Sequence, residues 1–150
     1  MPLILGQNSW TNREVLRLFK YMYQKPDRTF EELSHRVIGC AIEVHRELGP
    51  GLLESAYQRC LTNELTRNNI DHACEVLLPI SYKGDVIDCG YRADILIGQE
   101  MLLELKSVKQ LDPIHEAQLL TYMKLSSVRV GLLLNFNVDR LKDGMKRLVL

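Results

Sequence analysis

The feature that most constrains the fold is a pair of apolar runs joined by a short polar turn. The runs Val86–Ile97 and Met101–Val108 have the composition of strands, and Gly98-Gln99-Glu100 separates them. A three-residue loop that contains glycine is typical of a β-hairpin, so the two runs are predicted to pair antiparallel. This loop length puts Ile97 opposite Met101. The pairing fixes which side chains share a face, because a slip of one residue would reverse every side chain.

The same register places four charged side chains together. Asp94 falls opposite Glu104, and Arg92 falls opposite Lys106. Glu104 and Lys106 are two residues apart in a strand, so both point to the same face. They stand in the apolar stretch LLELKSV, where a buried charge costs several kcal/mol unless it is paired or binds a metal ion. Spacing alone leaves two readings open: a metal site, or two salt bridges, Asp94–Arg92 and Glu104–Lys106.

The metal reading follows from the two opposed carboxylates. Asp94 and Glu104 repel each other unless a cation lies between them. Oxygen ligands suit a hard divalent ion, so Mg²⁺ is the first expectation and Mn²⁺ the alternative. Such an ion makes bound water more acidic and neutralises charge on a phosphate oxygen, while Lys106 is placed to orient the water.

Length and composition limit the classes of protein to which this chain can belong. Its 150 residues suit one domain, with 46% hydrophobic and 25% charged residues. The charges balance at 19 basic and 19 acidic residues, which counts against strong sequence-independent binding of nucleic acid. The cysteines include no CxxC pair, so a zinc or iron–sulfur cage is not expected. No apolar run is long enough to span a bilayer and no secretory signal pattern is present, so a cytoplasmic protein with no membrane association is expected.

The rest of the chain is interpreted as an irregular arm followed by one domain. Residues 1–30 hold one amphipathic helix, and residues 31–150 hold the main helices and strands. The elements expected beyond the hairpin are helices at Phe30–Leu48, at Leu52–Asn68 and from Asp112-Pro113 through Leu125, strands at Glu75–Tyr82 and Val128–Phe136, and an amphipathic piece at Asp139–Leu150. The order helix-strand-strand-strand-helix-strand predicts an α/β fold with a mixed central β-sheet flanked by helices.

An acidic residue on the second helix adds to the candidate site. Glu54 shares a helical face with the apolar residues Tyr57, Leu61 and Leu65, so its carboxylate is expected to point inward. Near a helix N-terminus, an acid also interacts favourably with the helix dipole. Both roles are compatible, and the site interpretation makes Glu54 a third acidic group that leans toward the sheet.

The stretch around Glu54 resembles a known family. Gly51-Leu52-Leu53-Glu54-Ser55-Ala56-Tyr57 matches the GxxExxY signature, and it lies within the longer stretch IEVHRELGPGLLESAY. Four further stretches follow in the family's order: YRADIL, LLELKSV, HEAQLLTYMKL and GLLLNFN. Over about residues 31–150, the chain resembles the GxxExxY family, a compact branch of the PD-(D/E)XK nuclease-like superfamily. The resemblance implies a restriction-endonuclease-like core with a metal site built from Glu54, Asp94, Glu104 and Lys106.

The resemblance also covers residues around the site. Gln118 and Tyr122 match the QxxxY motif of the superfamily, and their spacing of four places both on one face of a helix. They are expected to contact substrate or to support the metal ligands. His45, in the stretch EVHRELGPG, either places the turn or contacts phosphate, and Arg92 is expected near the substrate.

Two functions stay open at this point. The first is an enzyme that hydrolyses phosphodiester bonds in DNA or RNA with Mg²⁺. In it, Asp94, Glu104 and the Leu105 carbonyl bind the ion, Lys106 orients or activates water, and Glu54 supports a ligand water or a second ion. The alternative is a catalytically silent module that binds nucleic acid or a protein partner through the same fold. A purely structural role for the charges ranks last, and the sequence leaves the oligomeric state open, a homodimer included.

Overall fold

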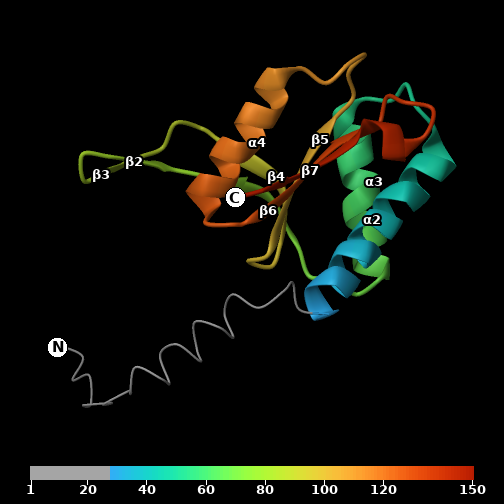
Figure 1. The fold of residues 1–150 in the computed structure, drawn as a ribbon, viewed down its shortest axis with the longest axis horizontal. Helices are drawn as coiled ribbons and strands as arrows, with labels where there is room; N and C mark the ends of the chain where they lie inside the picture. The colour runs from blue at the N-terminus through green and yellow to red at the C-terminus, as the bar shows by residue number, and fades with distance from the viewer. Residues whose placement is uncertain (1–27) are drawn as a thin grey trace. The chain divides into compact units, whose positions relative to one another are not determined.

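The described part of the chain, residues 28–150, alternates helices with strands (Figure 1). The structure is a computed structural model, and it confirms the mixed α/β class expected from the sequence. The amphipathic helix expected in the N-terminal arm lies outside the described residues. The whole sheet belongs to the compact unit Ser34–Leu150.

Three helices form where the apolar periodicity predicts them. They are α2 (Arg28–Leu48), α3 (Glu54–Arg67) and α4 (Pro113–Ser126). Gly49 follows α2 with a φ of +66°, a conformation that glycine adopts without strain. Asp112 caps α4 as expected, and its backbone amide donates to Nδ1 of His115 at 3.0 Å. Among the described residues, no helix combines the length and the apolar character that crossing a membrane requires.

Five strands form one mixed sheet in the order β1-β4-β5-β6-β7. Their bounds are β1 Ala73–Leu77, β4 Arg92–Ile97, β5 Met101–Lys106, β6 Val130–Asn135 and β7 Met145–Val149. β5 and β6 are parallel, and every other neighbouring pair is antiparallel. The predicted hairpin register is confirmed at its turn, because Ile97 pairs with Met101. The strand predicted at Val128–Phe136 is β6, which lies inside the sheet between β5 and β7.

The strand boundaries differ from the predictions in three places. The runs Glu75–Tyr82 and Val86–Ile97 are each interrupted. The end of the first run, β2 (Ile80–Tyr82), and the start of the second, β3 (Asp85–Ile87), pair as a separate hairpin. Pro79 has no amide hydrogen for a ladder, and the Asp88 carboxylate accepts from the amide of Gly90 at 2.8 Å, which makes a local turn. The piece expected at Asp139–Leu150 is a short 3₁₀ helix, η1 (Leu141–Gly144), followed by the edge strand β7.

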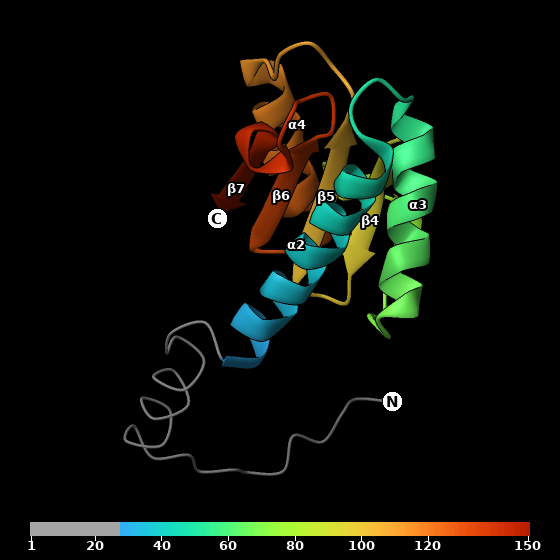
Figure 2. The same cartoon turned by 90° about the vertical axis from the view of Figure 1, so that its right-hand side faces the viewer.

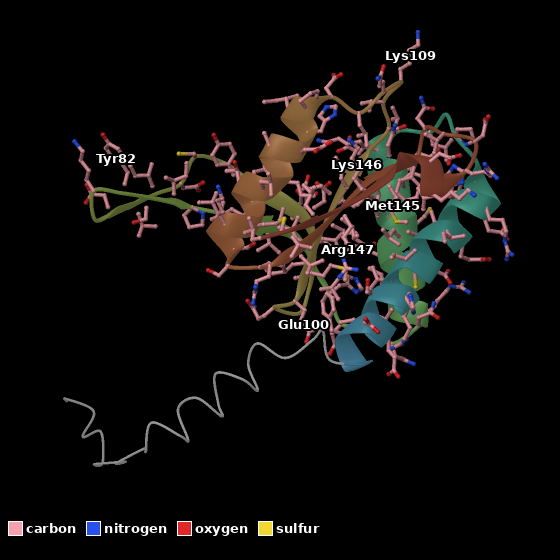
Figure 3. All side chains as sticks on the ribbon, in the orientation of Figure 1. Tyr82, Glu100, Lys109, Met145, Lys146 and Arg147 are labelled. Carbon is pink, nitrogen blue, oxygen red and sulfur yellow. The ribbon has the colours of Figure 1, made fainter. Side chains whose placement is uncertain are left out.

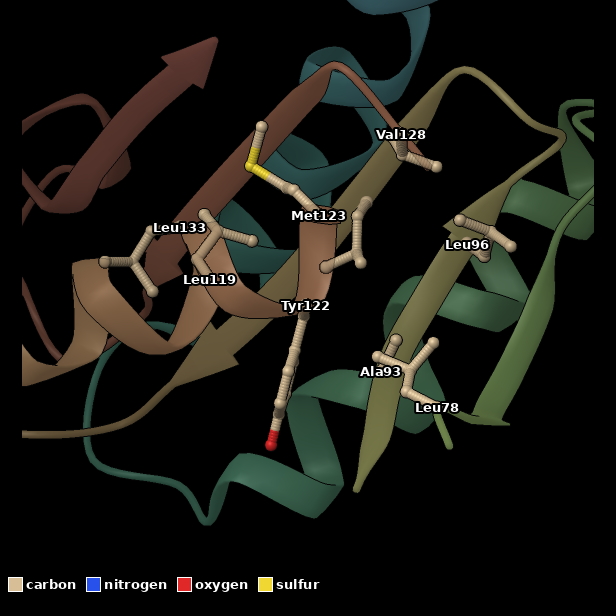
Figure 4. Packing of buried hydrophobic residues seen from close by; sticks show 9 residues of the cluster. Leu78, Ala93, Leu96, Leu119, Tyr122, Met123, Val128 and Leu133 are labelled. Atoms are coloured by element: carbon tan, nitrogen blue, oxygen red, sulfur yellow. The ribbon is translucent and has the colours of Figure 1, made fainter. Parts of the chain in front are cut away.

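Helices cover both faces of the sheet. α4 lies on one face, and α3 with the part of α2 from Ser34 onward lies on the other (Figures 1 and 2). On the α4 face, Leu119 and Met123 pack with Leu102 and Leu133 of the strands in one buried cluster (Figure 4). On the other face, the ring of Tyr57 stacks on Phe136 with centroids 4.5 Å apart. The sheet and the helices on its two faces form a sandwich. Asp94, Glu104 and Lys106 lie toward the end of the sheet where β4 begins and β5 ends.

Close packing between α4 and β6 depends on a glycine. A Cβ atom at Gly131 would lie 2.6 Å from Sδ of Met123 and 2.9 Å from Cδ1 of Leu119. Both side chains are fully buried, so they have little room to move away. Gly131 therefore sets how closely α4 approaches the sheet, and with it the position of Gln118 and Tyr122 on that helix.

Candidate functional site

Asp94 and Glu104 are joined at the point where the β4–β5 ladder stops. The backbone pairing runs from the turn as far as Ile95 and Leu103. Beyond it, the amide of Asp94 donates to Oε1 of Glu104 at 3.0 Å, and the amide of Leu105 donates to Oδ2 of Asp94 at 2.8 Å. Side-chain carboxylates thus occupy the places that backbone carbonyls hold elsewhere in an antiparallel ladder. The two strands part here, and the two acids fill the space between them.

Burial strongly affects the ionisation of this pair. Glu104 is 3% exposed, and burial together with the neighbouring Asp94 charge raises the pKa of its carboxyl to about 8. Burial also raises the pKa of Asp94, although the Leu105 amide and the hydrogen bond between the two carboxyl groups oppose that rise. At neutral pH, the two carboxyl groups therefore tend to share a proton when no cation is bound.

Lys106 is held by a chain of hydrogen bonds from α4. Its Nζ donates to Oε1 of Gln118 at 3.2 Å, and Nε2 of Gln118 donates to the hydroxyl of Tyr122 at 2.9 Å. Burial raises the pKa of Tyr122, and the charges of Glu104 and Asp94 add to the rise, whereas the bond from Gln118 opposes it. The ammonium group, the amide and the phenol therefore line the α4 side of the carboxylate pair.

Glu54 approaches the site from the first turn of α3. Its carboxyl group is partly buried, and burial raises its pKa; the positive charge of Lys106 lowers it, and the charge of Asp94 raises it. His115, in the first turn of α4, also acts on Glu54 by lowering its pKa. Charged side chains at the N-termini of α3 and α4, Glu54 and His115, therefore interact at the same end of the sheet.

The GxxExxY residues have distinct places around that helix start. Gly51 has a φ of +101°, which an L side chain rarely adopts. Tyr57 is fully buried; its hydroxyl donates to the carbonyl of Gly49 and accepts from the amide of Leu52. The hydroxyl of Tyr57 therefore holds the Gly49–Leu52 turn against α3. This turn sets where α3 begins, and with it the position of Glu54.

Sequence reasoning missed two polar residues beside Asp94. Nε2 of Gln58 donates to Oε1 of Glu75 at 2.6 Å and to the backbone carbonyl of Asp94 at 3.4 Å. Glu75 lies in β1 between Cys74, which pairs with Ile95, and Val76, which pairs with Ala93, and its φ is +50°. A signal was present for both: Gln58 is four residues after Glu54 on α3, and Glu75 is a lone charge in the run ACEVLL.

The expected pairing of Arg92 with Lys106 is wrong. The pairing of β4 with β5 ends at Ile95 and Leu103, so Arg92 pairs only on its β1 side, with Leu77, and Lys106 only on its β6 side, with Asn135. Because β4 and β5 separate at the two carboxylates, Arg92 is not carried across to β5, and it is exposed. The alternative of two salt bridges, Asp94–Arg92 and Glu104–Lys106, is not borne out, because neither is among the ion pairs within residues 28–150, which include Arg46–Glu43, Arg140–Asp143 and Lys146–Glu116.

His45 is placed inside the fold. Its Nε2 lies 2.7 Å from the carbonyl oxygen of Val138, and its ring lies near that of Phe136 with centroids 6.2 Å apart. The residue is 7% exposed, so the imidazole links α2 to the segment after β6. Its carbonyl accepts from the amide of Gly49, which agrees with the turn-placing alternative.

The oxygen atoms at the site suit a hard divalent cation whose remaining coordination positions are filled by water or substrate. Within residues 28–150, no three histidine, cysteine or acidic side chains converge as ready metal ligands. The available donors are the carboxylates of Asp94 and Glu104, and Glu54 is close enough for its charge to interact with that of Asp94. Mg²⁺ characteristically binds through one or two carboxylates together with water and substrate phosphate. A cation can also replace the proton that the pair shares, so the residues fit the ion.

Comparison with models of protein families identifies a superfamily for this chain. The model of the PD-(D/E)XK nuclease superfamily matches residues 31–148. Neither the curated proteins nor the solved structures include a match to this chain. The matched range contains the carboxylate pair, Lys106, the strands from β1 to β6 and all of β7 except Val149. This chain therefore belongs to the PD-(D/E)XK nuclease superfamily.

Proposed function

We propose that this chain is a divalent-metal-dependent nuclease of the GxxExxY type, which hydrolyses phosphodiester bonds in DNA or RNA. The observation that carries the proposal is the pair formed by partly buried Asp94 and buried Glu104, with Lys106 two residues after Glu104 in β5. A structural role alone does not account for two mutually repelling acids side by side where β4 and β5 part, since an apolar pair would avoid their desolvation cost. Membership of a nuclease superfamily makes nucleic acid the expected substrate.

The proposed metal ligands are the carboxylates of Asp94 and Glu104 and the carbonyl of Leu105, with Glu54 close enough to interact electrostatically. Mg²⁺ is the preferred ion and Mn²⁺ the alternative, because both favour oxygen donors. When bound, such an ion supplies positive charge beside the phosphate and makes a nearby water more acidic.

Lys106 is proposed to orient the attacking water and to stabilise negative charge as it develops on the phosphate. Gln118 accepts from its ammonium group, which limits the directions in which Nζ can point. Tyr122 in turn holds Gln118. We assign these two residues a positioning role, and Glu54 the support of a ligand water or a second ion.

The first test is a calorimetric titration with Mn²⁺, which requires no knowledge of the substrate. The wild type is compared with Asp94→Asn and Glu104→Gln, which keep the shape of each side chain. We expect about one ion per chain in the wild type and none in either variant. Asp71→Asn and Glu47→Gln alter exposed acids and serve as matched controls that retain binding.

The second test is cleavage of labelled DNA and RNA with Mg²⁺ or Mn²⁺. Lys106→Met keeps the length of the side chain and removes its charge, so we expect a loss of at least about 100-fold. Lys142→Met, at an exposed lysine, is the control. Equal activity in the wild type and Lys106→Met would contradict the assigned chemistry.

One observation favours the alternative of a catalytically silent module. The carboxylates of Asp94 and Glu104 already have hydrogen-bond partners within the protein, so the fold does not require an ion. A silent module would bind nucleic acid or a protein partner, show no cleavage with any divalent ion, and bind equally well after Lys106→Met. The Mn²⁺ titration and the cleavage assay together separate the two functions.

A further inference from the structure

An outer hairpin, β2–β3, projects away from the sheet beside α4 (Figure 1). Every residue from Ser81 to Arg92 is exposed, so the hairpin contributes little to the core of the protein. A two-stranded hairpin without a packed face is marginally stable in water. Its base is closed by the amide of Leu78, which donates to the carbonyl of Tyr91 at 2.8 Å. Tyr91 therefore stands at a fixed point, where the outer hairpin returns to the sheet.

Tyr91 lies next to the candidate site. Its ring centroid is 5.9 Å from that of Tyr122, with the two planes tilted by 50°. The hydroxyl of Tyr122 contacts Gln118, which contacts Lys106, so one continuous chain of contacts joins Tyr91 to the site lysine. In Figure 4 the hydroxyl of Tyr122 points away from the apolar cluster around it. Tyr91 remains 39% exposed, although its neighbour Tyr122 is buried.

The charges near Tyr91 favour contact with a base over contact with phosphate. Residues 80–91 carry Lys83 against Asp85 and Asp88, so the outer hairpin offers no basic surface for a duplex backbone. An exposed aromatic ring at a fixed position is what base stacking requires, and stacking is available to any base that is not already stacked in a duplex. Arg92, the next residue, is exposed and offers a separate cation for phosphate.

We propose that Tyr91 stacks on an unpaired base of the nucleic acid bound at the Asp94–Glu104–Lys106 site. The substrate class is then nucleic acid with an unpaired base beside the phosphate that is attacked: a single strand, a frayed end or a loop. This inference rests on the proposed function, because it requires nucleic acid at that site. Tyr91 sets substrate preference by binding and takes no part in the chemical step.

The test compares binding of two short single strands to the full-length Lys106→Ala chain with Mn²⁺ present, measured by fluorescence anisotropy. One strand carries normal bases, and the matched strand is abasic throughout, with the same phosphates. Tyr91→Ala is expected to weaken binding of the normal strand about tenfold and to leave the abasic strand unchanged. Tyr91→Trp keeps a stacking ring and is expected to bind as the parent does. Tyr82→Ala removes an exposed tyrosine at the far end of the hairpin, as Figure 3 shows, and serves as the matched control.

A phosphate contact gives a different pattern. Arg92→Ala is expected to weaken binding of both strands equally and to reduce the salt dependence. If Tyr91→Ala also weakens both strands equally, or if it has no effect on the normal strand, the stacking role is wrong. Thermal melts show whether Tyr91→Ala is folded, and Tyr91→Leu, which keeps apolar bulk against Tyr122, replaces it if it is not.

The outcome also separates this inference from the proposed function. If the wild-type chain neither binds nor cleaves either DNA or RNA with Mn²⁺, the proposed function fails and the inference fails with it. If the wild type cleaves single strands and Tyr91→Ala cleaves them with unchanged KM and kcat, only the inference fails. Support for both requires a raised KM, an unchanged kcat and no effect of Tyr91→Ala on binding to a blunt duplex.

Discussion

The amide of Asp94 donates a hydrogen bond to the carboxylate of Glu104 at 3.0 Å, in a place where two neighbouring strands would ordinarily join backbone to backbone. The Asp94 carboxylate receives the amide of Leu105 in return. Both acids are therefore anchored through backbone groups, which side-chain motion does not easily displace. A site anchored in this way keeps its ligands in place before a cation arrives, which reduces the ordering cost of binding.

The stability of the metal-free protein is predicted to fall as the pH rises from about 4.5 to about 8. The pKa of Glu104 is about 8 in the folded protein against an ordinary value of 4.5, so the unfolded chain releases this proton first. The contribution of protonated Glu104 to the free energy of unfolding is fully present below pH 4.5 and is lost as the pH rises through about 8. Between these two values, the free energy of unfolding falls by up to about 1.4 kcal/mol per pH unit. Thermal melts in chelator measure the effect.

Glu104→Gln carries no titrating group at this position, so its melting temperature should depend less on pH across the same window. Glu47→Gln, at an exposed position, should follow the wild type. A wild-type melting temperature that rises steadily from pH 5 to pH 8, with Glu104→Gln parallel to it, would show that Glu104 titrates normally. Added Mn²⁺ should raise the wild-type melting temperature most at the alkaline end, where the pair is ionised.

Gln118→Ala is predicted to lower the cleavage rate by about 10- to 100-fold and to leave Mn²⁺ affinity unchanged. The reason is that Gln118 contacts Nζ of Lys106 and not the carboxylates. Gln118→Glu keeps an acceptor for the ammonium group and should recover much of the rate. Gln110→Ala, at an exposed glutamine, is the control. Equal loss of metal binding and cleavage would mean that Gln118 supports the carboxylate pair instead.

Tyr57→Phe is predicted to destabilise the protein by about 1–2 kcal/mol and to reduce cleavage. The change keeps the ring stacked on Phe136 but leaves the carbonyl of Gly49 and the amide of Leu52 without their hydroxyl partner. The turn before Glu54 then has more freedom. Chemical denaturation measures the first effect, and Tyr82→Phe, whose side chain is exposed, should leave the free energy of unfolding unchanged.

Gly131→Ala is predicted to cost about 1–3 kcal/mol, because the added methyl group meets Met123 and Leu119 between α4 and the sheet. Gly39→Ala is the matched control. Its position in α2 has no atom within 4 Å of the new Cβ, so the change should stabilise the helix by up to about 1 kcal/mol. If Gly131→Ala is as well tolerated as Gly39→Ala, the contact between α4 and β6 is looser than these distances indicate.

Local patterns in the sequence predicted the helices and the turn of the central hairpin well. Apolar periodicity located α2 and α3, and Asp112-Pro113 located the start of α4. The turn length gave the pairing of Ile97 with Met101. Each of these follows from residues close together in the chain, where the backbone period of helix or strand applies directly.

The errors arose where distant residues decide the outcome. The register from the turn could not show that the ladder ends at Ile95, because the two carboxylates that part the strands act through hydrogen bonds to backbone amides. The amphipathic piece predicted at Asp139–Leu150 was not assigned to a strand, and its pairing with β6 makes Met145–Val149 the strand β7. Glu75 was missed because it lies in β1, about 20 residues from Asp94.

The sequence by itself determined that Glu104 and Lys106 share a face of one strand, since a two-residue step returns a side chain to the same side of the sheet. It also determined that Glu54 lies near the start of a helix, with Tyr57 about one turn later on the same face. Only the tertiary structure decided that Gln118 reaches Lys106 and that Tyr91 stands beside Tyr122. Those contacts depend on how closely α4 packs on the sheet, and that distance is set by the volumes of side chains from separate segments, which no local period encodes.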